Sequence, residues 1–306
     1  LNSSMPLATV SFPPLKIALA ATAAGALEVG VPVLGGDALE HLFPDAVPAG
    51  RSGALALFRQ GAWLLGGATV SARNLEEAAH GLYTDIFRAA RGLHLARIWQ
   101  YVPAINAPGP GGMENYRLFC RARSLAFEQH HGAGFKQLLP SASAVGSQSG
   151  ALTIIFAASP TLPRHVENPM QVSAYDYPED YGPRAPSFAR ATVVPGPDRS
   201  TVFISGTAAI RGYATIAPHR LLPQLQCTLE NLRQISSACG LGPDLDRHGR
   251  SVRHFKVYLR HAADQAEVAE ILERELLTKA DQVSYLHADV CRKDLVVEIE
   301  ATLVGV

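Results

Sequence analysis

The residues with the clearest chemical potential are two glutamates in the apolar segment 295–304. Glu298 and Glu300 stand two apart, and residues at that spacing on a strand point to the same side. An unpaired buried carboxylate is costly, so this face must be either solvent or a polar site. Valine and isoleucine flank Glu298, a setting that raises a carboxyl pKa and favours a proton donor. Two ordinary glutamates on a solvated face are the alternative interpretation.

A cysteine stands close to this pair in the sequence. Cys291 precedes a turn predicted at Arg292-Lys293-Asp294, and we expect 283–291 and 295–304 to be neighbouring strands. In a tight hairpin, the Cys291 thiol and the Glu298 carboxyl could lie near each other. A small apolar core residue is the alternative, because free cysteines are commonly buried.

The segment from Tyr181 to Arg190 could bind an anionic ligand. Its prolines restrict the backbone, and it carries the arginines Arg184 and Arg190. Arginine binds a carboxylate through two parallel hydrogen bonds, so a rigid loop of this kind suits a substrate with two negative charges. A surface loop with solvated arginines is the alternative.

Small residues follow the apolar stretch that ends at Ile204. A ligand could approach the backbone closely there, although a tight bend has the same composition. The residues concerned are Ser205, Gly206, Thr207, Ala208 and Ala209.

Other site types are excluded because their motifs are missing. Among the eleven histidines only His130 and His131 cluster, and no HxH, HExxH or Cys/His ligand spacing occurs. The glycine-rich segment 109–112 lacks the GxxxxGK[ST] pattern of a phosphate-binding loop, and no GxSxG motif of an α/β-hydrolase is present. We therefore expect neither a metal nor a cofactor.

Composition and charge narrow the class of protein. The chain has 306 residues, 47% of them hydrophobic, which is enough for one large domain or two ordinary ones. Its 27 basic residues balance its 27 acidic ones and form no run, which argues against nucleic-acid or polybasic membrane binding. Four cysteines without a CxxC pair indicate free thiols in a reducing cytoplasm.

The N-terminal part of the chain resembles a targeting segment only superficially. No apolar run is long enough to span a bilayer, but the alanine-rich segment 16–26 imitates a signal peptide. Two prolines precede this segment and it holds few large apolar residues, so we expect a strand-forming N-terminus. Met5 is a candidate for the natural start.

The elements that must position these residues occur twice along the chain. The first half has, in order, a hairpin over 53–70, a helix over 75–90 with Asn74 as its N-cap, a strand over 93–102, a helix over 113–129 and a strand pair over 142–158. After an irregular segment, the second half has a hairpin over 190–210, a helix over 218–239, a strand over 252–260, a helix over 263–278 and a strand pair over 283–304.

This repeat predicts an α+β fold of tandem βαβαβ domains, each a mixed sheet covered by two helices. We place the boundary after residue 158, which gives an N-terminal domain over 1–158 and a C-terminal domain over 159–306. When the last strands of the halves are superposed, Ile155 falls on the position of Glu298. This asymmetry suggests that the second half kept a functional carboxylate.

The second half resembles the reactive-intermediate deaminase (Rid) family. The residues that carry the resemblance are Val202 to Gly206, Gln224, Leu229 to Leu232, Gly240 and Val297 to Ala301. The family's substrate-binding arginine is missing, because Val283 and Ser284 stand where it is expected. This departure weakens an interpretation as an imine deaminase.

The whole chain resembles the chorismatases more closely. These are enzymes of the Rid-like (chorismate-mutase-like) fold with a degenerate first domain, and they act on chorismate. The resemblance is carried by Arg97 to Trp99, Tyr101 to Pro103, Ile105-Asn106, Glu114, Tyr116, Phe119, Arg123, the segment from Tyr181 to Arg190, Ser205 to Ala208, Cys291 and Glu298.

The resemblance also implies roles for individual residues. The catalytic glutamate of the family falls on Glu298. Cys291 falls on the position that separates product types: cysteine there is similar to the 3-hydroxybenzoate-forming group, and alanine to the group that releases a dihydrodiol by hydrolysis. A second selectivity position falls on Ala208 or Ala209. The expected substrate-binding residues are Arg184, Arg190, Tyr181, Ser205, Gly206, Ala208, Ala209, Tyr213, Arg123 and Arg260.

The expected function is the conversion of chorismate to pyruvate plus 3- or 4-hydroxybenzoate, with Glu298 protonating the enolpyruvyl methylene carbon. A chorismate hydrolase that gives the dihydroxycyclohexadiene carboxylate, a Rid-type imine deaminase and a non-catalytic small-molecule binder are the alternatives. We expect a cytoplasmic monomer whose tandem domains replace a subunit interface, with no nucleic-acid or membrane partner.

Overall fold

The structure is a computed structural model that describes residues 9–11, 27–41 and 43–306. Met5 and the segment 16–26, where we expect a strand-forming N-terminus, lie outside the described residues. None of the helices in the described ranges is long and apolar enough to cross a membrane.

The first unit of the molecule, which we define as residues 47–159, is a six-stranded sheet with two helices. The strand order is β5-β6-β7-β10-β8-β9, and only the β8–β9 pair is parallel. The strands are β5 (Val47–Ser52), β6 (Leu55–Gln60), β7 (Trp63–Ser71), β8 (His94–Pro103), β9 (Ser141–Ser147) and β10 (Ala151–Ser159), and the helices are α1 (Leu75–Ala89) and α2 (Asn115–His131).

Helix α1 begins and packs as its sequence predicts. The Asn74 side chain accepts a hydrogen bond from the backbone N–H of Glu77, and acidic residues occupy the first turn. Its apolar positions at helical spacing, such as Leu82 and Ile86, are buried against the sheet. The predicted N-cap and helix are therefore confirmed.

The second unit, residues 164–304, repeats this plan and takes one more strand from the N-terminal stretch. Its strand order is β11-β12-β13-β18-β16-β17-β3. The strands are β11 (Arg164–Val166), β12 (Ala191–Val194), β13 (Thr201–Ala208), β16 (Val252–Leu259), β17 (Gln282–His287), β18 (Val297–Val304) and β3 (Val33–Gly36), and the helices are α3 (Leu221–Cys239) and α4 (Gln265–Glu275). The α+β fold of two tandem units is confirmed.

Several short elements complete the described chain. They are β1 (Thr9–Ser11), β2 (Leu27–Glu28) and β4 (Leu39–His41) in a small sheet, the pair β14 (Ile210–Arg211) and β15 (Ala214–Thr215), and the 3-10 turns η1 (Pro110–Gly112), η2 (Phe135–Leu138), η3 (Ala174–Asp176), η4 (Glu179–Tyr181) and η5 (Ala262–Asp264).

The predicted hairpin at the end of the chain is wrong. Strand β17 ends at His287, residues 288–296 form an irregular loop, and β18 begins at Val297. Strand β16 lies between the two, parallel to β17 and antiparallel to β18. The same holds in the first unit, where β8 separates β9 from β10. A crossover helix joins the parallel pair β16–β17, and β18 then pairs with the other side of β16, so β17 and β18 are not neighbours in the sheet.

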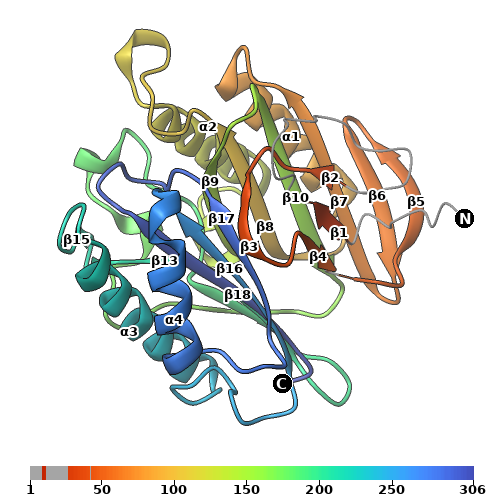
Figure 1. Ribbon diagram of the computed structural model, residues 1–306. Coiled ribbons are helices and arrows are strands. Elements are labelled where there is room, and N and C mark those ends of the chain that lie inside the picture. Colours follow the sequence, from red (N-terminus) through yellow and green to blue (C-terminus); the bar gives the residue numbers. More distant parts are fainter. Residues whose placement is uncertain (1–8, 12–26, 42) are drawn as a thin grey trace, which may run out of the picture.

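The two sheets face each other, and the helices cover the outer sides (Figure 1). Helices α1 and α2 share one core with the first sheet, and α3 and α4 share another with the second. A third cluster fills the space between the sheets and includes Trp99 and Ile155 from the first unit, and Phe203 and Tyr258 from the second.

Glu298 lies on the side of β18 that faces the layer between the sheets. Ile155 belongs to its apolar cluster, and Glu298 stands opposite Tyr258, another member, on the neighbouring strand. Strand β9 closes one side of this layer, because the Ala142 N–H donates to Ser205 Oγ at 2.8 Å. The first unit is therefore in direct contact with the strand that carries the small residues.

Candidate active site

A cavity of about 900 Å³ lies where the two units meet. The first unit lines it with residues 106–117, and the second with the segments 177–190, 206–218 and 291–298. Six of the residues proposed from the sequence line this cavity: Glu298, Cys291, Arg190, Tyr181, Gly206 and Ala208.

Glu298 is the buried acid of the cavity. It lies on β18 opposite Ala208 on one side and Tyr258 on the other, and it is only 3% exposed. A Cβ atom on Gly206 would lie 2.0 Å from Glu298 Oε1, so only glycine permits this approach. Burial, and then the negative charge of Glu300, raise the pKa of Glu298 to about 8. At neutral pH this side chain is mainly a carboxylic acid.

Glu300 has the opposite character although it shares the face of β18. Lys256 Nζ lies 2.6 Å from one carboxyl oxygen, and Arg97 Nη2 lies 2.9 Å from the other. Burial alone would raise the pKa of Glu300, but these two cations hold it below the ordinary value. The strand therefore presents a protonated and an ionised carboxyl side by side.

Cys291 lies in the loop 288–296 and faces the same cavity as Glu298. The side chain is partly buried and is not in a disulfide. Burial, and then the charge of Glu298, raise the pKa of the Cys291 thiol to about 12. Cys291 is thus a neutral thiol beside the acid and not a nucleophilic thiolate.

Arg190 supplies positive charge to the cavity wall. Its Nη2 donates to the Tyr177 hydroxyl at 2.7 Å, and its guanidinium lies over the rings of Tyr177 and Phe188. Its Nε is buried and has no hydrogen-bond partner among the described residues. Arg190 is therefore held rigidly with a free N–H group.

Arg292 forms a second cationic group in the same wall. Its Nη1 donates to the Tyr213 carbonyl oxygen at 2.8 Å, and its guanidinium lies 4.2 Å from the centre of the Tyr181 ring. Its Nη2 is buried and lacks a hydrogen-bond partner within the described ranges. Two rigid guanidinium groups with free N–H donors suit a ligand with carboxylates.

Two of the arginines proposed from the sequence point elsewhere. Arg184 pairs with Glu128 of helix α2 at 2.6 Å, outside the cavity. Arg123 is buried inside the first unit, where its Nη1 donates to Gln100 at 2.7 Å. The structure does not bring these two guanidinium groups to the cavity.

Arg260 and Tyr213 lie behind or beside the cavity wall. Arg260 donates to the carbonyl oxygens of Leu295 at 2.7 Å and Arg292 at 3.0 Å, and so fixes the loop that carries Cys291. Tyr213 is 48% exposed, and its carbonyl positions Arg292. Both residues act on the loop and not on the cavity directly.

Ser205 and Ala209 are interior residues. The Ser205 hydroxyl donates to the Ala189 carbonyl at 2.6 Å and accepts from Ala142, which joins the two units. Ala209 is fully buried in an apolar cluster with Val290 and Leu295. The structure places Ala208, and not Ala209, on the cavity.

Sequence reasoning missed Arg292 as a ligand-binding candidate. It stands in a run of charged residues next to Cys291, which we interpreted only as a turn. The aromatic rings of Tyr177 and Phe188 that hold the two arginines were also missed, although both lie in the tyrosine- and proline-rich segment before β12. The position of Tyr177 and Phe188 in the same segment as Arg190 could have indicated that their rings contact its guanidinium.

The side chains that face the cavity are suited to proton transfer and anion binding. Glu298 offers a proton from a dry environment, and the wall offers Arg190 and Arg292 to negative groups. Among the residues that the structure describes, no group of three or more His, Cys, Asp or Glu could hold a metal ion.

Comparisons with known proteins point to one family. Residues 42–158 match the family model described as "Chorismatase FkbO/Hyg5-like, N-terminal". A Streptomyces hygroscopicus protein named "Chorismatase" is 35% identical over 83% of this chain and 75% of its own length. Another from the same organism, named "3-hydroxybenzoate synthase", is 39% identical over 74% of this chain and 69% of its own length. A chorismatase crystal structure superposes with a TM-score of 0.79 at 29% identity, covering 96% of this chain and 91% of that chain.

Proposed function

This chain belongs to the chorismatase family, and from that premise we propose that it converts chorismate to pyruvate and a hydroxybenzoate, with Glu298 as the general acid. The observation that carries the assignment of roles is one arrangement. A buried, protonated Glu298 faces a cavity whose wall holds two arginines with free N–H groups. Acid and anion-binding groups are the two things that this substrate requires.

Arg190 and Arg292 are proposed to bind the two carboxylates of chorismate. Each guanidinium is fixed by aromatic rings and has a buried N–H without a partner among the described residues. A charge-assisted hydrogen bond from a rigid donor orients the substrate with little further loss of entropy. Neutralising these cations also makes ionisation of Glu298 less favourable, because Arg190 lowers its pKa in the free protein.

Glu298 then protonates the methylene carbon of the enolpyruvyl ether. The proton moves from the carboxyl oxygen to carbon, and the ether oxygen shares the positive charge of the resulting oxocarbenium ion. The neighbouring ring hydroxyl attacks the oxocarbenium carbon, and its proton returns to the Glu298 carboxylate. The bond between that oxygen and the ring then breaks as the ring carbon that bears the ether oxygen loses its proton, which makes the ring aromatic. The resulting hemiketal collapses to pyruvate and the hydroxybenzoate. The hydroxybenzoate and pyruvic acid together contain the same atoms as chorismic acid, so no water is consumed overall.

The side chains of Cys291 and Ala208 are proposed to influence which nucleophile reaches the oxocarbenium ion. Both line the cavity, and Ala208 stands opposite Glu298 across the β13–β18 pair. Attack by water instead of the ring hydroxyl would give pyruvate and the dihydroxycyclohexadiene carboxylate. The size and polarity at these two positions would set the ratio of the two routes.

Incubation of the purified protein with chorismate tests this function. Pyruvate is measured with lactate dehydrogenase and NADH, and the aromatic product is compared by chromatography with 3-hydroxybenzoate, 4-hydroxybenzoate and the dihydrodiol. We expect pyruvate and a hydroxybenzoate in equal amounts. Absence of pyruvate, together with ammonia release from a dehydrated amino acid, would instead favour an imine deaminase.

We also propose that residues 1–158 and 159–306 are the two domains, and that the protein is a cytoplasmic monomer. The change from β10 to β11 at residues 159–164 supports the boundary. The packing of one sheet against the other supports a monomer, because it already buries a face that a single domain would expose. Four free cysteines support a reducing compartment.

A further inference from the structure

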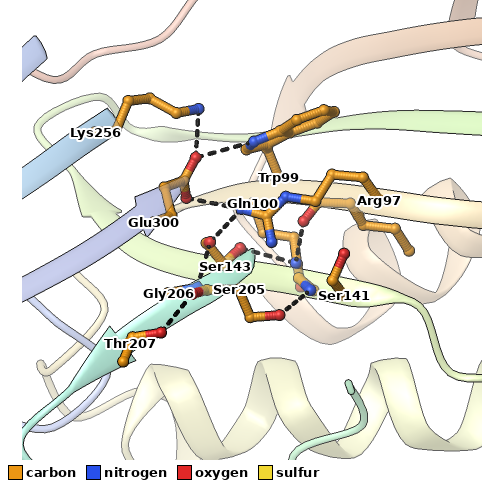
Figure 2. A network of polar contacts seen from close by, with 12 residues as sticks. Arg97, Trp99, Gln100, Ser141, Ser143, Ser205, Gly206, Thr207, Lys256 and Glu300 are labelled. Atoms are coloured by element: carbon orange, nitrogen blue, oxygen red, sulfur yellow. Dashed lines mark hydrogen bonds and ion pairs between the residues drawn. The ribbon is translucent and has the colours of Figure 1, made fainter. Parts of the chain in front are cut away.

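Buried charges surround Glu300 (Figure 2), which stands two residues from the catalytic acid proposed above on β18. Glu300 Oε1 accepts from Trp99 Nε1 at 3.0 Å and lies 2.6 Å from Lys256 Nζ, while Oε2 lies 2.9 Å from Arg97 Nη2. The side chains of all three charged residues are at most 2% exposed. Fully buried ion pairs are costly to assemble, and a hydrophobic replacement would often be as stable. This cluster therefore needs an explanation other than stability.

The charges of the cluster balance without Glu298. Lys256 also lies 2.6 Å from Glu40, which in turn contacts His254 at 3.2 Å. The cations Arg97 and Lys256 are thus matched by the anions Glu40 and Glu300. An ionised Glu298, two residues from Glu300 on the same face of β18 and only 3% exposed, would add a further negative charge beside this balanced cluster.

We propose that Glu300 is a positioning residue of the reaction, whose ion-paired carboxylate keeps the neighbouring Glu298 carboxyl protonated and ready to donate. This inference rests on the proposed function, because it assigns a role relative to the general acid. The geometry of the cluster carries this inference. Two cations and an indole N–H hold the negative charge of Glu300 in a fixed position near Glu298.

The groups that face Glu298 from other elements act partly against Glu300. They are Arg97 from β8, Arg190 from the loop before β12 and the Cys291 thiol from the loop 288–296. Tyr258 of β16 stands opposite Glu298 in the sheet. The two arginines favour the ionised form of Glu298, but Arg97 is itself engaged by Glu300. Removing Glu300 would therefore end its repulsion of an ionised Glu298 and would leave Arg97 free to stabilise that ionised form. Both effects lower the pKa of Glu298.

Arg97 connects this cluster to the position of the acid as well. Its Nη2 contacts Ser143 Oγ, and Ser143 Oγ accepts from the backbone N–H of Gly206 at 2.9 Å (Figure 2). Gly206 is the residue against which the Glu298 carboxyl lies. The first unit thus supports both the charge environment and the placement of Glu298.

The test is the pH dependence of kcat/KM for pyruvate release by Glu300→Gln. Two charges about 6–7 Å apart on alternate strand positions interact strongly in a buried site. The loss of activity at high pH, which reports deprotonation of the acid in the free enzyme, should move down by about one to two pH units. Arg97→Gln removes a cation and should move this loss of activity, the high-pH limb of the profile, to higher pH.

A structural role for Glu300 predicts a different result. Activity would fall by the same factor at every pH, and the high-pH limb would stay where it is in the wild type, which would overturn the proposal. If Glu300→Gln does not fold, the double variant Glu300→Gln/Lys256→Gln removes one charge of each sign and leaves the net charge of the cluster unchanged. A downward shift is still expected there, although a smaller one, because the lost cation Lys256 contacts Glu300 and not Glu298; an unmoved limb again contradicts the proposal.

Failure of this inference can be told apart from failure of the proposed function. Wild-type protein that releases no pyruvate from chorismate contradicts the function itself. Wild-type protein that releases pyruvate, with an unmoved limb in the Glu300 and Arg97 variants, contradicts only the role of Glu300.

Discussion

Glu298 and Glu300 occupy equivalent sites on one face of β18 and yet differ in protonation. The pKa of Glu298 is raised to about 8, whereas that of Glu300 is lowered by Lys256 and Arg97. The sequence predicts that both side chains share a face and that apolar neighbours surround Glu298. It also predicts Glu298 as the proton donor, but not that Glu300 is an ion-paired carboxylate, because the cations that hold Glu300 come from β16 and from the other unit.

The two arginines of the proline-rich segment provide a matched pair of variants. We expect Arg190→Ala to raise the KM for chorismate by about 10- to 150-fold, the equivalent of about 1.5–3 kcal/mol for one lost charge-assisted contact. Arg184→Ala is the control, because Arg184 pairs with Glu128 outside the cavity. Steady-state kinetics decide the matter: an equal rise of KM in both variants would contradict the location of the binding site.

Replacing Cys291 by alanine should change the products more than the rate. The thiol faces the cavity beside Glu298, so the smaller side chain leaves room for water to compete with the ring hydroxyl. We expect more dihydrodiol at similar total pyruvate, measured by chromatography. Cys239→Ala is the control, since Cys239 is buried on α3. An identical product ratio in wild type and Cys291→Ala would remove Cys291 from the mechanism.

At the scale of elements, the loop 288–296 is the part of the fold that the sequence predicted least well. The sequence predicts that it holds the end of one strand, a turn at 292–294 and the start of a second strand, because 283–291 mixes apolar and polar residues and 295–304 is mostly apolar. The loop instead crosses from β17 over β16 to reach β18, and Arg260 replaces the missing strand hydrogen bonds by donating to its carbonyls. Cys291 still reaches Glu298, but through this loop and not through a hairpin.

Arg260 should therefore act on the order of this loop. Arg260→Met leaves the carbonyls of Leu295 and Arg292 without their donor and breaks the contact of Nη2 with Asn106 Oδ1 at 3.0 Å. We expect faster amide hydrogen exchange in 288–296 and a loss of kcat/KM of about tenfold or more, given about 1–3 kcal/mol for an unsatisfied buried group. The exposed Arg250→Met is the control. Unchanged exchange in the loop would show that Arg260 does not hold it.

At the scale of the whole molecule, the duplication predicted from the order of elements is correct, but its use is not evident from the sequence. The first unit has Ile155 where we aligned Glu298, and it contributes no general acid to the proposed mechanism. It nevertheless supplies Arg97, Trp99 and Ser143 to the support of that acid. These contacts join strands that are far apart in the sequence, so the spacing of residues along the chain could not predict them.

The buried acid should also limit the stability of the protein at high pH. The Glu298 carboxyl has an ordinary pKa of 4.5 and a pKa of about 8 in the folded protein. Its contribution to the free energy of unfolding is therefore fully present below pH 4.5 and is lost as the pH rises to 8. Glu298→Gln removes this dependence of stability on pH. We expect the variant to exceed the wild type by at least about 1 kcal/mol at pH 8.5, or about 2 °C or more in Tm, and by much less at pH 5. A Tm difference that does not depend on pH would contradict a buried neutral acid.

The most direct test of the central claim is the rate of pyruvate release from chorismate by wild type and Glu298→Gln between pH 6 and 9. We predict that wild-type kcat/KM falls as the pH rises through about 8, because Glu298 must carry its proton. At pH 6–7, where wild-type Glu298 carries its proton, the folded variant should lose about 10²–10⁴-fold, the usual contribution of a general acid, and its residual rate should show no fall near pH 8. A variant that keeps more than about a tenth of the wild-type rate, or that retains the wild-type limb, would contradict the assignment of Glu298 as the proton donor.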